Sequence, residues 1–267
     1  MYRSATIHAG IMLSATTSIQ IVTADLNRAK ARIASEVQVK RETKYYLDNI
    51  KSVKTSKNFV NNYRLFSYAM NAYGLSDMTY AKTMMQRVMD GGVTNAKSMA
   101  NHLSDPRFKA FAKAFDFGDK GAGVTASDAA NTATTKSYIE QALEDDVGEQ
   151  NEGARIALYF MRNAPNITSG YQVLGDKALF RFVQTAFDIP ATSSNTLDRV
   201  SKLIESKIHI GDLKDSDKVK TMVKRFVTLW DLQNSSTQST SGLQLGQSAT
   251  FGGVASLPAI QSRYSQF

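Results

Sequence analysis

The sequence predicts an all-α protein that contains two related helical repeats and a low-complexity C-terminal tail. Three observations predict this fold class. The chain of 267 residues has only 4 prolines and 16 glycines and is 42% hydrophobic, a composition that favours helix over strand. Apolar residues recur at steps of three and four along most of the chain, as on one face of a helix. Finally, a shift of 114 positions, without a gap, carries the apolar pattern of residues 45–75 onto that of residues 159–189.

The two matching segments predict an internal duplication. Under the shift, Tyr45 meets Tyr159 and Asn49 meets Asn163. A match at fixed spacing argues for two copies of one helical unit that share a core. From N- to C-terminus we therefore expect a flexible leader at 1–15; a helical body at 16–232, made of repeat one at about 17–117, a linker at 118–134 and repeat two at about 136–232; and a Ser/Thr/Gln/Gly-rich tail at 233–267.

Repeat one begins with a helical pattern over residues 17–50, which predicts one long helix or a helix broken in the mid-thirties. Shorter helices are expected at 56–62 and 63–73, the second ended by Gly74 in a left-handed C-cap. Ser76 is the expected N-cap of a helix at 77–90 that Gly91 and Gly92 end. The Asp105-Pro106 pair predicts an N-cap followed by the first helical residue of 107–117.

Repeat two follows the small and polar residues of the linker. A helical region starts near Lys136, is loosened by Gly148 and Gly153, and resumes through Arg162. Further helices are expected at 169–174, 176–188, 195–207 and 215–231. The tail has one charged side chain, Arg263, and cannot form a core of its own, so we expect it to be disordered in isolation. Its apolar residues could dock on a partner or on the body; these are Leu243, Leu245, Phe251, Val254, Leu257, Ile260 and Phe267.

The sequence contains no recognisable catalytic, cofactor-binding or metal site. The chain has no cysteine, and its histidines, His8, His102 and His209, are far apart. The glycines of residues 118–123 follow a helix, whereas a phosphate cradle needs them between a strand and a helix. The acidic residues are interpreted as a solvated helix face, because nothing in the sequence predicts a pocket that shifts the pKa of one of them; they are Glu140, Glu144, Asp145, Asp146, Glu149 and Glu152. The aromatic residues lie at helical spacing in both repeats and are assigned to core packing.

Charge leaves several kinds of partner open. The net charge of +8 could favour nucleic acid, anionic lipid or an acidic protein. Basic and acidic residues alternate along most helices, which favours a solvated, mildly basic surface. No apolar run approaches the roughly 20 residues that span a bilayer. The first residues do not make a Sec signal peptide, so export would need a route without that signal.

Five segments of the body resemble a known family. They are RETKYYLDNIKSVKT (41–55), RLFSYAMNAYGLSDMTYAKTMMQRVMDGG (64–92), DPRFKAFAKAFDFG (105–118), LEDDVGEQNEGARIALYFMRNAP (143–165) and DKALFRFVQTAFDIP (176–190). In this order they resemble the alphaproteobacterial domain-of-unknown-function 1217 family over about residues 16–232. Members of that family tend to be encoded among flagellar genes, so the resemblance implies a flagellum-associated role. It carries over no catalytic residues.

Two functions follow as hypotheses. The first is a non-enzymatic structural or assembly protein of the bacterial flagellum that acts through protein–protein contacts, as a homo-oligomer or with other flagellar components. Its expected contact elements are the 17–50 helix and the apolar residues of the tail. The second is a cytoplasmic regulator or chaperone-like binding protein that touches nucleic acid through the basic residues Lys202, Lys207, Lys218, Lys220, Lys224 and Arg225. Nucleic acid is the less favoured partner, because acidic residues are interspersed with the basic ones.

Overall fold

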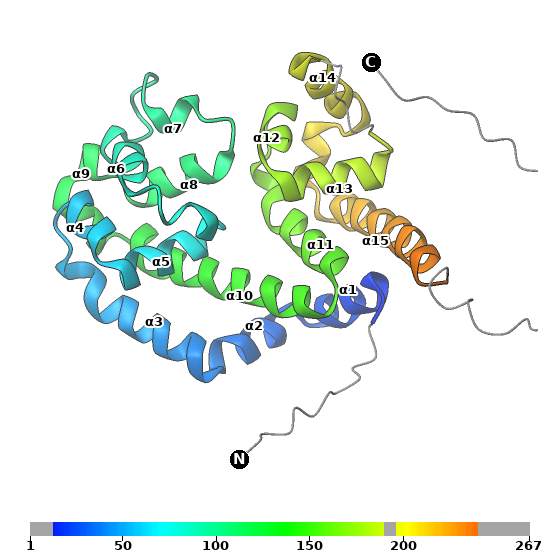
Figure 1. The fold of residues 1–267 in the computed structure, drawn as a ribbon, viewed down its shortest axis with the longest axis horizontal. Coiled ribbons are helices and arrows are strands. Elements are labelled where there is room, and N and C mark those ends of the chain that lie inside the picture. The colour runs from blue at the N-terminus through cyan, green and yellow to red at the C-terminus, as the bar shows by residue number, and fades with distance from the viewer. Residues whose placement is uncertain (1–12, 190–195, 240–267) are drawn as a thin grey trace, which may run out of the picture.

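The computed structural model describes residues 13–189 and 196–239, and over these residues the fold is all-α, as the sequence predicts. Two groups of helices stand on either side of a gap, and α10 (Thr134–Gln150) runs beneath both (Figure 1). None of the described helices is long and apolar enough to cross a lipid bilayer.

The first group contains α3 (Val37–Asn49), α4 (Ser56–Asn61), α5 (Tyr63–Ala72), α6 (Lys82–Gly91), α7 (Met99–His102), α8 (Pro106–Ala114) and α9 (Phe117–Lys120). The second contains α11 (Glu152–Asn163), α12 (Gly170–Gly175), α13 (Lys177–Phe187), α14 (Leu197–Lys207) and α15 (Ser216–Ser239).

Each group, which we call the first unit and the second unit, has its own hydrophobic core. In the first unit, Phe59 and Phe111 each lie 4.8 Å, centroid to centroid, from Phe115. In the second unit, Phe182 stacks between Phe160 at 3.6 Å and Phe226 at 4.5 Å. The expectation that the two units share one core was therefore wrong. Most of the aromatic residues do pack inside, although Tyr63, Tyr80 and Tyr171 are exposed, and the buried ones belong to two separate clusters.

Tyr138 of α10 connects the two cores. Its side chain is partly buried against both clusters, and its ring stacks on Tyr68 of α5 at 3.9 Å. The helix that carries it packs against α5 of the first unit and α11 of the second. A single helix thus supplies much of the contact that holds the units together.

Elements of the two units recur at the 114-residue spacing. The order α3, η1 (Ile50–Ser52), α4, α5 matches the order α11, η5 (Ala164–Asn166), α12, α13, with nearly the same bounds after the shift. The amide of Asn49 donates to the Tyr45 carbonyl at 2.8 Å, and the amide of Asn163 donates to the Tyr159 carbonyl at 2.8 Å. That the units are copies of one ancestral segment stays a prediction.

Left-handed backbone ends the matching helices at equivalent places. Gly74 has φ 68° after α5, and Asp188, at the same place in the repeat, has φ 53° after α13. The expected C-cap at Gly74 is thus confirmed, as is the Asp105-Pro106 start of α8, where Asp105 accepts from the backbone N–H of Arg107. Glycine adopts positive φ at little cost, and Asp is among the few other residues that tolerate it.

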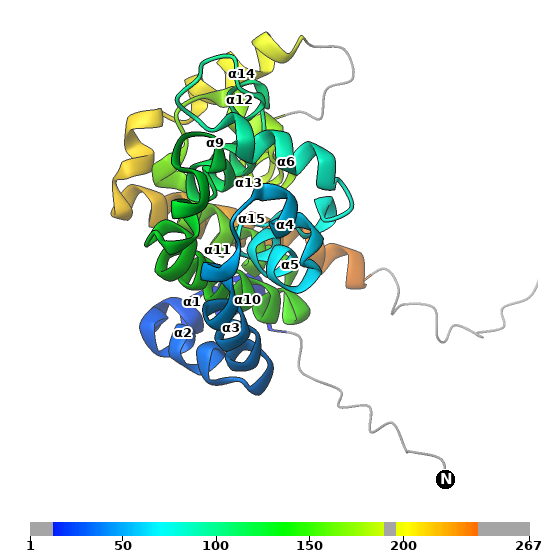
Figure 2. The same cartoon turned by 90° about the vertical axis from the view of Figure 1, so that its left-hand side faces the viewer.

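The predicted 17–50 helix is three helices: α1 (Ala15–Ala24), α2 (Leu26–Ser35) and α3. The first break lies at Asp25, whose carboxylate caps α2, and the second at Glu36, whose backbone is extended. Because of these breaks, α1 and α2 turn beneath α10 and α11 (Figures 1 and 2). Ala15, Ile19 and Ile33 pack in the core of the second unit, so the packing does not follow the expected boundary of repeat one at 17–117.

Both ends of the body extend beyond the predicted limits. The leader was expected to reach residue 15, but Ala15 is fully buried and begins α1. The carboxylate of Asp231 in α15 accepts from the backbone N–H of Ala15 at 2.8 Å and of Thr16 at 3.0 Å. At the other end, α15 continues to Ser239, past the expected end at 231. The rest of the predicted leader and tail, residues 1–12 and 240–267, lies outside the described residues.

The expected linker is part of the first unit rather than a spacer. It contains η3 (Gly121–Ala126) and η4 (Ala129–Ala133), and the side chains of Val124 and Ala130 are fully buried in the first core. The hydroxyl of Tyr46 donates to the carbonyl of Ala130 at 2.6 Å. Small residues allow this close packing, and the same small and polar composition is what predicted a linker.

The helical region is interrupted within residues 147–153, as expected, but the break lies at Asn151 rather than at a glycine. Gly148 lies within α10, which ends at Gln150, and Gly153 lies within α11, which the side chain of Asn151 caps. At Gly153, an added Cβ would lie 2.4 Å from the indole of Trp230. The absence of a side chain there lets α11 approach α15 closely.

Candidate functional site

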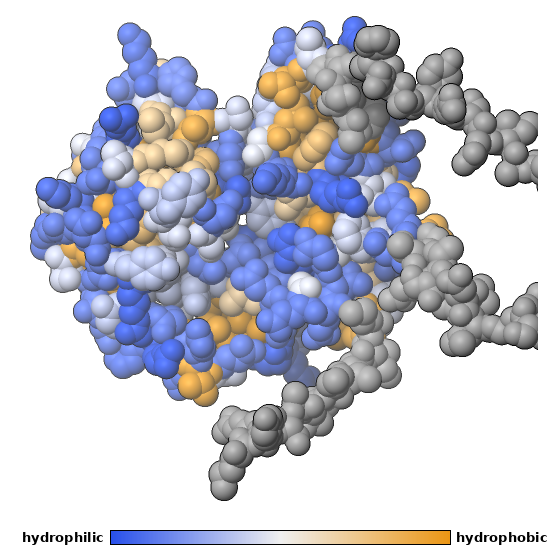
Figure 3. All heavy atoms as spheres, viewed as in Figure 1, coloured by the Kyte–Doolittle hydropathy of each residue, from blue (hydrophilic) through white to orange (hydrophobic). Residues whose placement is uncertain are grey.

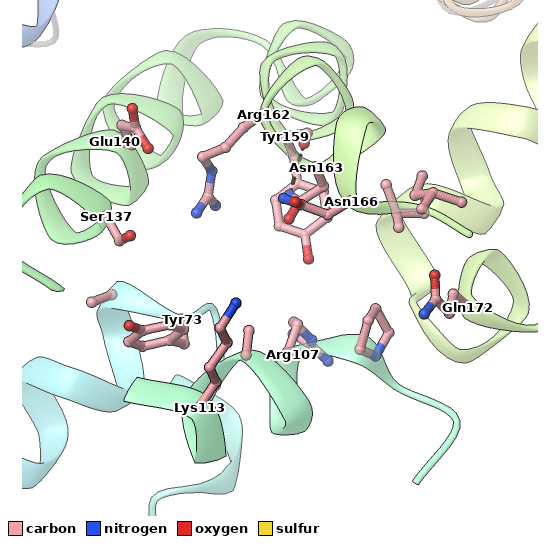
Figure 4. A pocket seen from close by; sticks show the side chains of 15 residues that line it. Tyr73, Arg107, Lys113, Ser137, Glu140, Tyr159, Arg162, Asn163, Asn166 and Gln172 are labelled. Atoms are coloured by element: carbon pink, nitrogen blue, oxygen red, sulfur yellow. Dashed lines mark hydrogen bonds between the residues drawn. The ribbon is translucent and has the colours of Figure 1, made fainter. Parts of the chain in front are cut away.

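A polar cavity of about 400 Å³ lies between the two units. Its walls come from α5 and α8 on one side and from α11 and α12 on the other, and α10 closes it along a third side (Figure 4). The surface of the molecule is hollowed between the units, and hydrophilic side chains cover most of the face shown in Figure 3. The polar and charged residues that line the cavity are Tyr73, Arg107, Lys113, Ser137, Glu140, Tyr159, Arg162, Asn163, Asn166 and Gln172.

The α10 side of the cavity is built on a buried ion pair. Glu144 is 2% exposed, and its two oxygens accept from Nε and Nη2 of Arg162 at 2.6 and 2.8 Å. The second hydrogen of Nη2 is directed to Oε1 of Gln141 at 3.0 Å. Burial raises the pKa of Glu144, and the Arg162 charge counteracts this shift. The pair joins α10 to α11.

The prediction of a solvated acidic face was therefore wrong in part. Glu144 is buried, and Glu140 is bound to Lys30 of α2 at 2.6 Å. Asp146 pairs with Arg32, also of α2. A signal for this arrangement was present in the sequence, since Glu140 and Glu144 share one helix face. The partners come from helices distant along the chain, and sequence spacing does not show which cation meets which carboxylate.

A second polar cluster closes the cavity at the end near α12. The guanidinium of Arg107 binds Asp105 at 2.7–3.1 Å and also donates to the carbonyl of Gly74. Across the gap, Tyr159 donates its hydroxyl hydrogen to the carboxylate of Asp176, which lies 3.8 Å from Arg107. Burial and the neighbouring Asp176 raise the pKa of Tyr159 well above its ordinary value. Asp176 is held in place because it also caps α13.

The units touch closely beside this cluster. An added Cβ at Gly175 of α12 would lie 2.7 Å from backbone atoms of Ser104, in the turn before α8. Glycine thus permits the two backbones to approach.

An apolar groove of about 620 Å³ lies elsewhere, between α1–α2 and α10. Ile21 stands at this groove and is 60% exposed. Asp25, Arg28, Arg32 and Asp146 supply both signs of charge around it. The groove is formed by part of the 17–50 segment that the sequence predicted as a contact element. It exists because this segment is broken into α1 and α2 rather than forming one straight helix.

The remaining sequence candidates do not assemble into a site. His102 ends α7 and His209 precedes η6 (Ile210–Lys214), while His8 lies outside the described residues. Across 13–189 and 196–239, no group of three or more His, Asp or Glu side chains is placed to hold a metal ion. The glycines of residues 118–123 lie in α9 and η3 and form no cradle between a strand and a helix.

The basic residues of α14 and α15 are partly neutralised. Lys218 pairs with Asp212 at 2.6 Å and Lys220 with Asp217 at 3.0 Å. The guanidinium of Arg225 lies over the ring of Phe187, 5.6 Å from its centroid. These contacts weaken the case for a phosphate-binding face, which needs several cations free to contact a nucleic acid backbone.

Comparison with known proteins shows which family the chain matches. The model of a family described as "Protein of unknown function (DUF1217)" matches residues 72–219. The X-ray structure of protein AGR_C_984 from Agrobacterium tumefaciens is 38% identical in sequence and superimposes with a TM-score of 0.77. The similarity covers 84% of this chain and 97% of that one. None of the curated proteins matches the chain.

Proposed function

Because the chain belongs to the DUF1217 family, we propose that it is a non-enzymatic component of the bacterial flagellum that acts through protein–protein contacts. The flagellar part of this proposal rests on the family resemblance found in the sequence. The contact part rests on one observation, the apolar groove between α1–α2 and α10. Homo-oligomers or mixed assemblies with other flagellar proteins are both compatible with it.

The groove has the features of a surface that receives a partner helix or segment. Ile21 is exposed and Leu13 and Val22 are partly exposed at the groove, whereas Leu143 and Val147, which also line it, are buried. Charged side chains of both signs surround it, as polar groups surround the apolar centre of many interfaces. Burial of apolar area stabilises a complex by about 25 cal/mol per Å² before the costs of association. Exposed Ile21 is the side chain whose burial would contribute most directly.

The alternative is a cytoplasmic regulator or chaperone-like protein, which could use the same groove. Its nucleic-acid version depends on the basic residues of α14 and α15, several of which are already paired with acidic or aromatic side chains. A DNA-binding titration at low salt tests that version, because phosphate contacts are strongest there. Absence of binding at low salt excludes it.

Fractionation of the native protein tests the proposal most directly. We expect the full-length protein in isolated flagella or basal bodies, and a deletion strain that swims poorly. In complementation, the Ile21→Asp variant is expected to restore swimming less well than the wild type, because it places a charge in the groove. Val37→Asp is the matched control, since Val37 is 84% exposed on α3 and does not line the groove.

Two results would contradict the proposal. One is a protein confined to the cell body together with normal swimming of the deletion strain. The other is equal swimming of strains that carry Ile21→Asp and Val37→Asp at equal protein levels, which would show that the groove makes no necessary contact.

A further inference from the structure

We propose that the cavity between the two units is a binding site for a small oxyanion, a molecule with a carboxylate or a phosphate group, held between Arg162 of the second unit and Lys113 of the first. The cavity is separate from the apolar groove, and neither proposal depends on the other. Its volume of about 400 Å³ falls in the range of small-molecule sites, roughly 300–1,000 Å³.

Arg162 presents donors to the cavity in a fixed orientation. Glu144 and Gln141 accept from its Nε and Nη2 and leave Nη1 without an acceptor in the described part of the chain. The guanidinium is thus held in place by one edge while its remaining donors face the cavity, and the side chain is only 20% exposed. A donor that is already oriented loses little conformational entropy when it binds a ligand oxygen.

Lys113 supplies the second cation from the opposite wall. It projects from α8 toward Arg162 (Figure 4). Neither an ion-pair nor a hydrogen-bond partner for its ammonium occurs at 13–189 or 196–239. Arg162 is already paired with Glu144, so Lys113 contributes the uncompensated charge and Arg162 contributes oriented donors. An anion between them would gain charge-assisted hydrogen bonds from both side chains.

The other charged groups near the cavity are already neutralised. Glu140 lines the wall but is bound to Lys30 at 2.6 Å, so its charge is compensated. Arg107 is compensated by Asp105 and Asp176. The unpaired charge therefore belongs to Lys113, and the arrangement favours an anion of one or two charges over a polyanion.

Neutral amides line the end of the cavity toward α12. Asn166 makes no side-chain hydrogen bond to another described residue. The carbonyl oxygen of Gln172 accepts from Thr168, and within 13–189 and 196–239 its amide N–H₂ group has no acceptor. Such groups suit a ligand with further hydroxyl or carbonyl oxygens beyond its anionic group. A small polar acid or a phosphate ester of that size fits this lining, in which the aliphatic side chains of Ile167 and Leu179 lie beside the polar ones.

Isothermal titration of the full-length protein tests the site, with sodium phosphate and sodium succinate as separate probes at constant ionic strength set by sodium chloride. We expect at least one probe to bind with a Kd below about 10 mM, and Lys113→Ala to weaken that binding by about tenfold or more, since charged hydrogen bonds have this size. Lys109→Ala is the matched control, an exposed lysine of the same helix that does not line the cavity, and its effect should stay below twofold. Preference for phosphate or for succinate identifies the source of the oxyanion.

The proposal is overturned if neither probe binds by about 10 mM, or if Lys113→Ala and Lys109→Ala weaken binding equally, which would indicate a general effect of surface charge. A folding control accompanies both variants: each must retain the helical circular dichroism of the wild type. Asn166→Ala is a second test variant, at an exposed residue that lines the cavity, and it should also weaken binding. With two test variants, the result does not depend on whether one of them folds.

Discussion

Replacement of Arg162 by Met removes the partner of a buried carboxylate while it keeps most of the side-chain volume. Glu144 is 2% exposed and depends on Arg162 for two hydrogen bonds, at 2.6 and 2.8 Å. Loss of one member of a buried ion pair leaves the other charge without compensation, at a typical cost of about 3–5 kcal/mol. We expect the Arg162→Met variant to fold, because small proteins have about 5–15 kcal/mol of stability in total.

The protonation of Glu144 sets an upper limit to the electrostatic part of this cost. An ordinary glutamate has a pKa of about 4.3, so taking up a proton at pH 7 costs about 3.7 kcal/mol. At pH 5 the same step costs only about 1 kcal/mol. We therefore expect the variant to lose about 3–4 kcal/mol at pH 7 and considerably less at pH 5.

The sign of this pH dependence follows from the raised pKa of Glu144. Burial already raises that pKa in the wild type, and Arg162 opposes the shift. Without Arg162 the folded state binds the proton more tightly than the unfolded state. The resulting stability is fully present below the unfolded pKa and is lost as the pH rises through the folded pKa.

Urea unfolding followed by circular dichroism at pH 5 and pH 7 measures the effect, with wild type and the double variant Glu144→Gln/Arg162→Met as references. The double variant has no buried charge at this place, so its loss should be smaller at pH 7 and nearly independent of pH. An equal loss for Arg162→Met at both pH values, or a double variant as unstable at pH 7 as the single one, would refute the reasoning.

Three further substitutions test the packing. Gly153→Ala should lower the free energy of unfolding by about 1–3 kcal/mol, because the added Cβ would lie 2.4 Å from Trp230. Gly211→Ala is the control: an added Cβ there meets nothing within 4 Å, so thermal unfolding should be almost unchanged. Phe182→Ala should cost about 3–5 kcal/mol, since it empties the stack between Phe160 and Phe226; a loss below about 1 kcal/mol in urea unfolding would contradict the described core. Asp231→Ala removes the carboxylate that accepts from the first two backbone N–H groups of α1 and should lower the free energy of unfolding by about 0.5–2 kcal/mol, with faster amide hydrogen exchange over residues 15–24 and unchanged exchange in α4 and α5.

Local signals in the sequence predicted many helix ends correctly because capping acts over a few residues. Asp105 and Pro106 start α8, and Gly74 and Gly92 have the positive φ that ends a helix. Burial of the aromatic residues also followed from their spacing. These features depend on neighbours three or four positions away, so a single sequence contains the information.

The candidate site could not be predicted in the same way. The charge and helical spacing of Glu140 and Glu144 were visible, but Arg162 and Lys113 gained significance only from their positions on opposite walls of one cavity. Lys113 is separated from Arg162 by α9, η3, η4 and α10 along the chain. No periodic pattern relates residues at that separation.

The sequence by itself determined the all-α class, most helix boundaries and the apolar pattern that recurs after 114 residues, because backbone hydrogen bonds, caps and amphipathic faces are local properties. Only the tertiary structure decided that there are two cores rather than one, and that α1 and α2 join the second unit. It also decided that the small residues of the 118–134 segment pack inside and that a polar cavity opens between the units. Those outcomes depend on which helix faces meet, and long-range packing chooses among partners that the sequence pattern leaves equivalent.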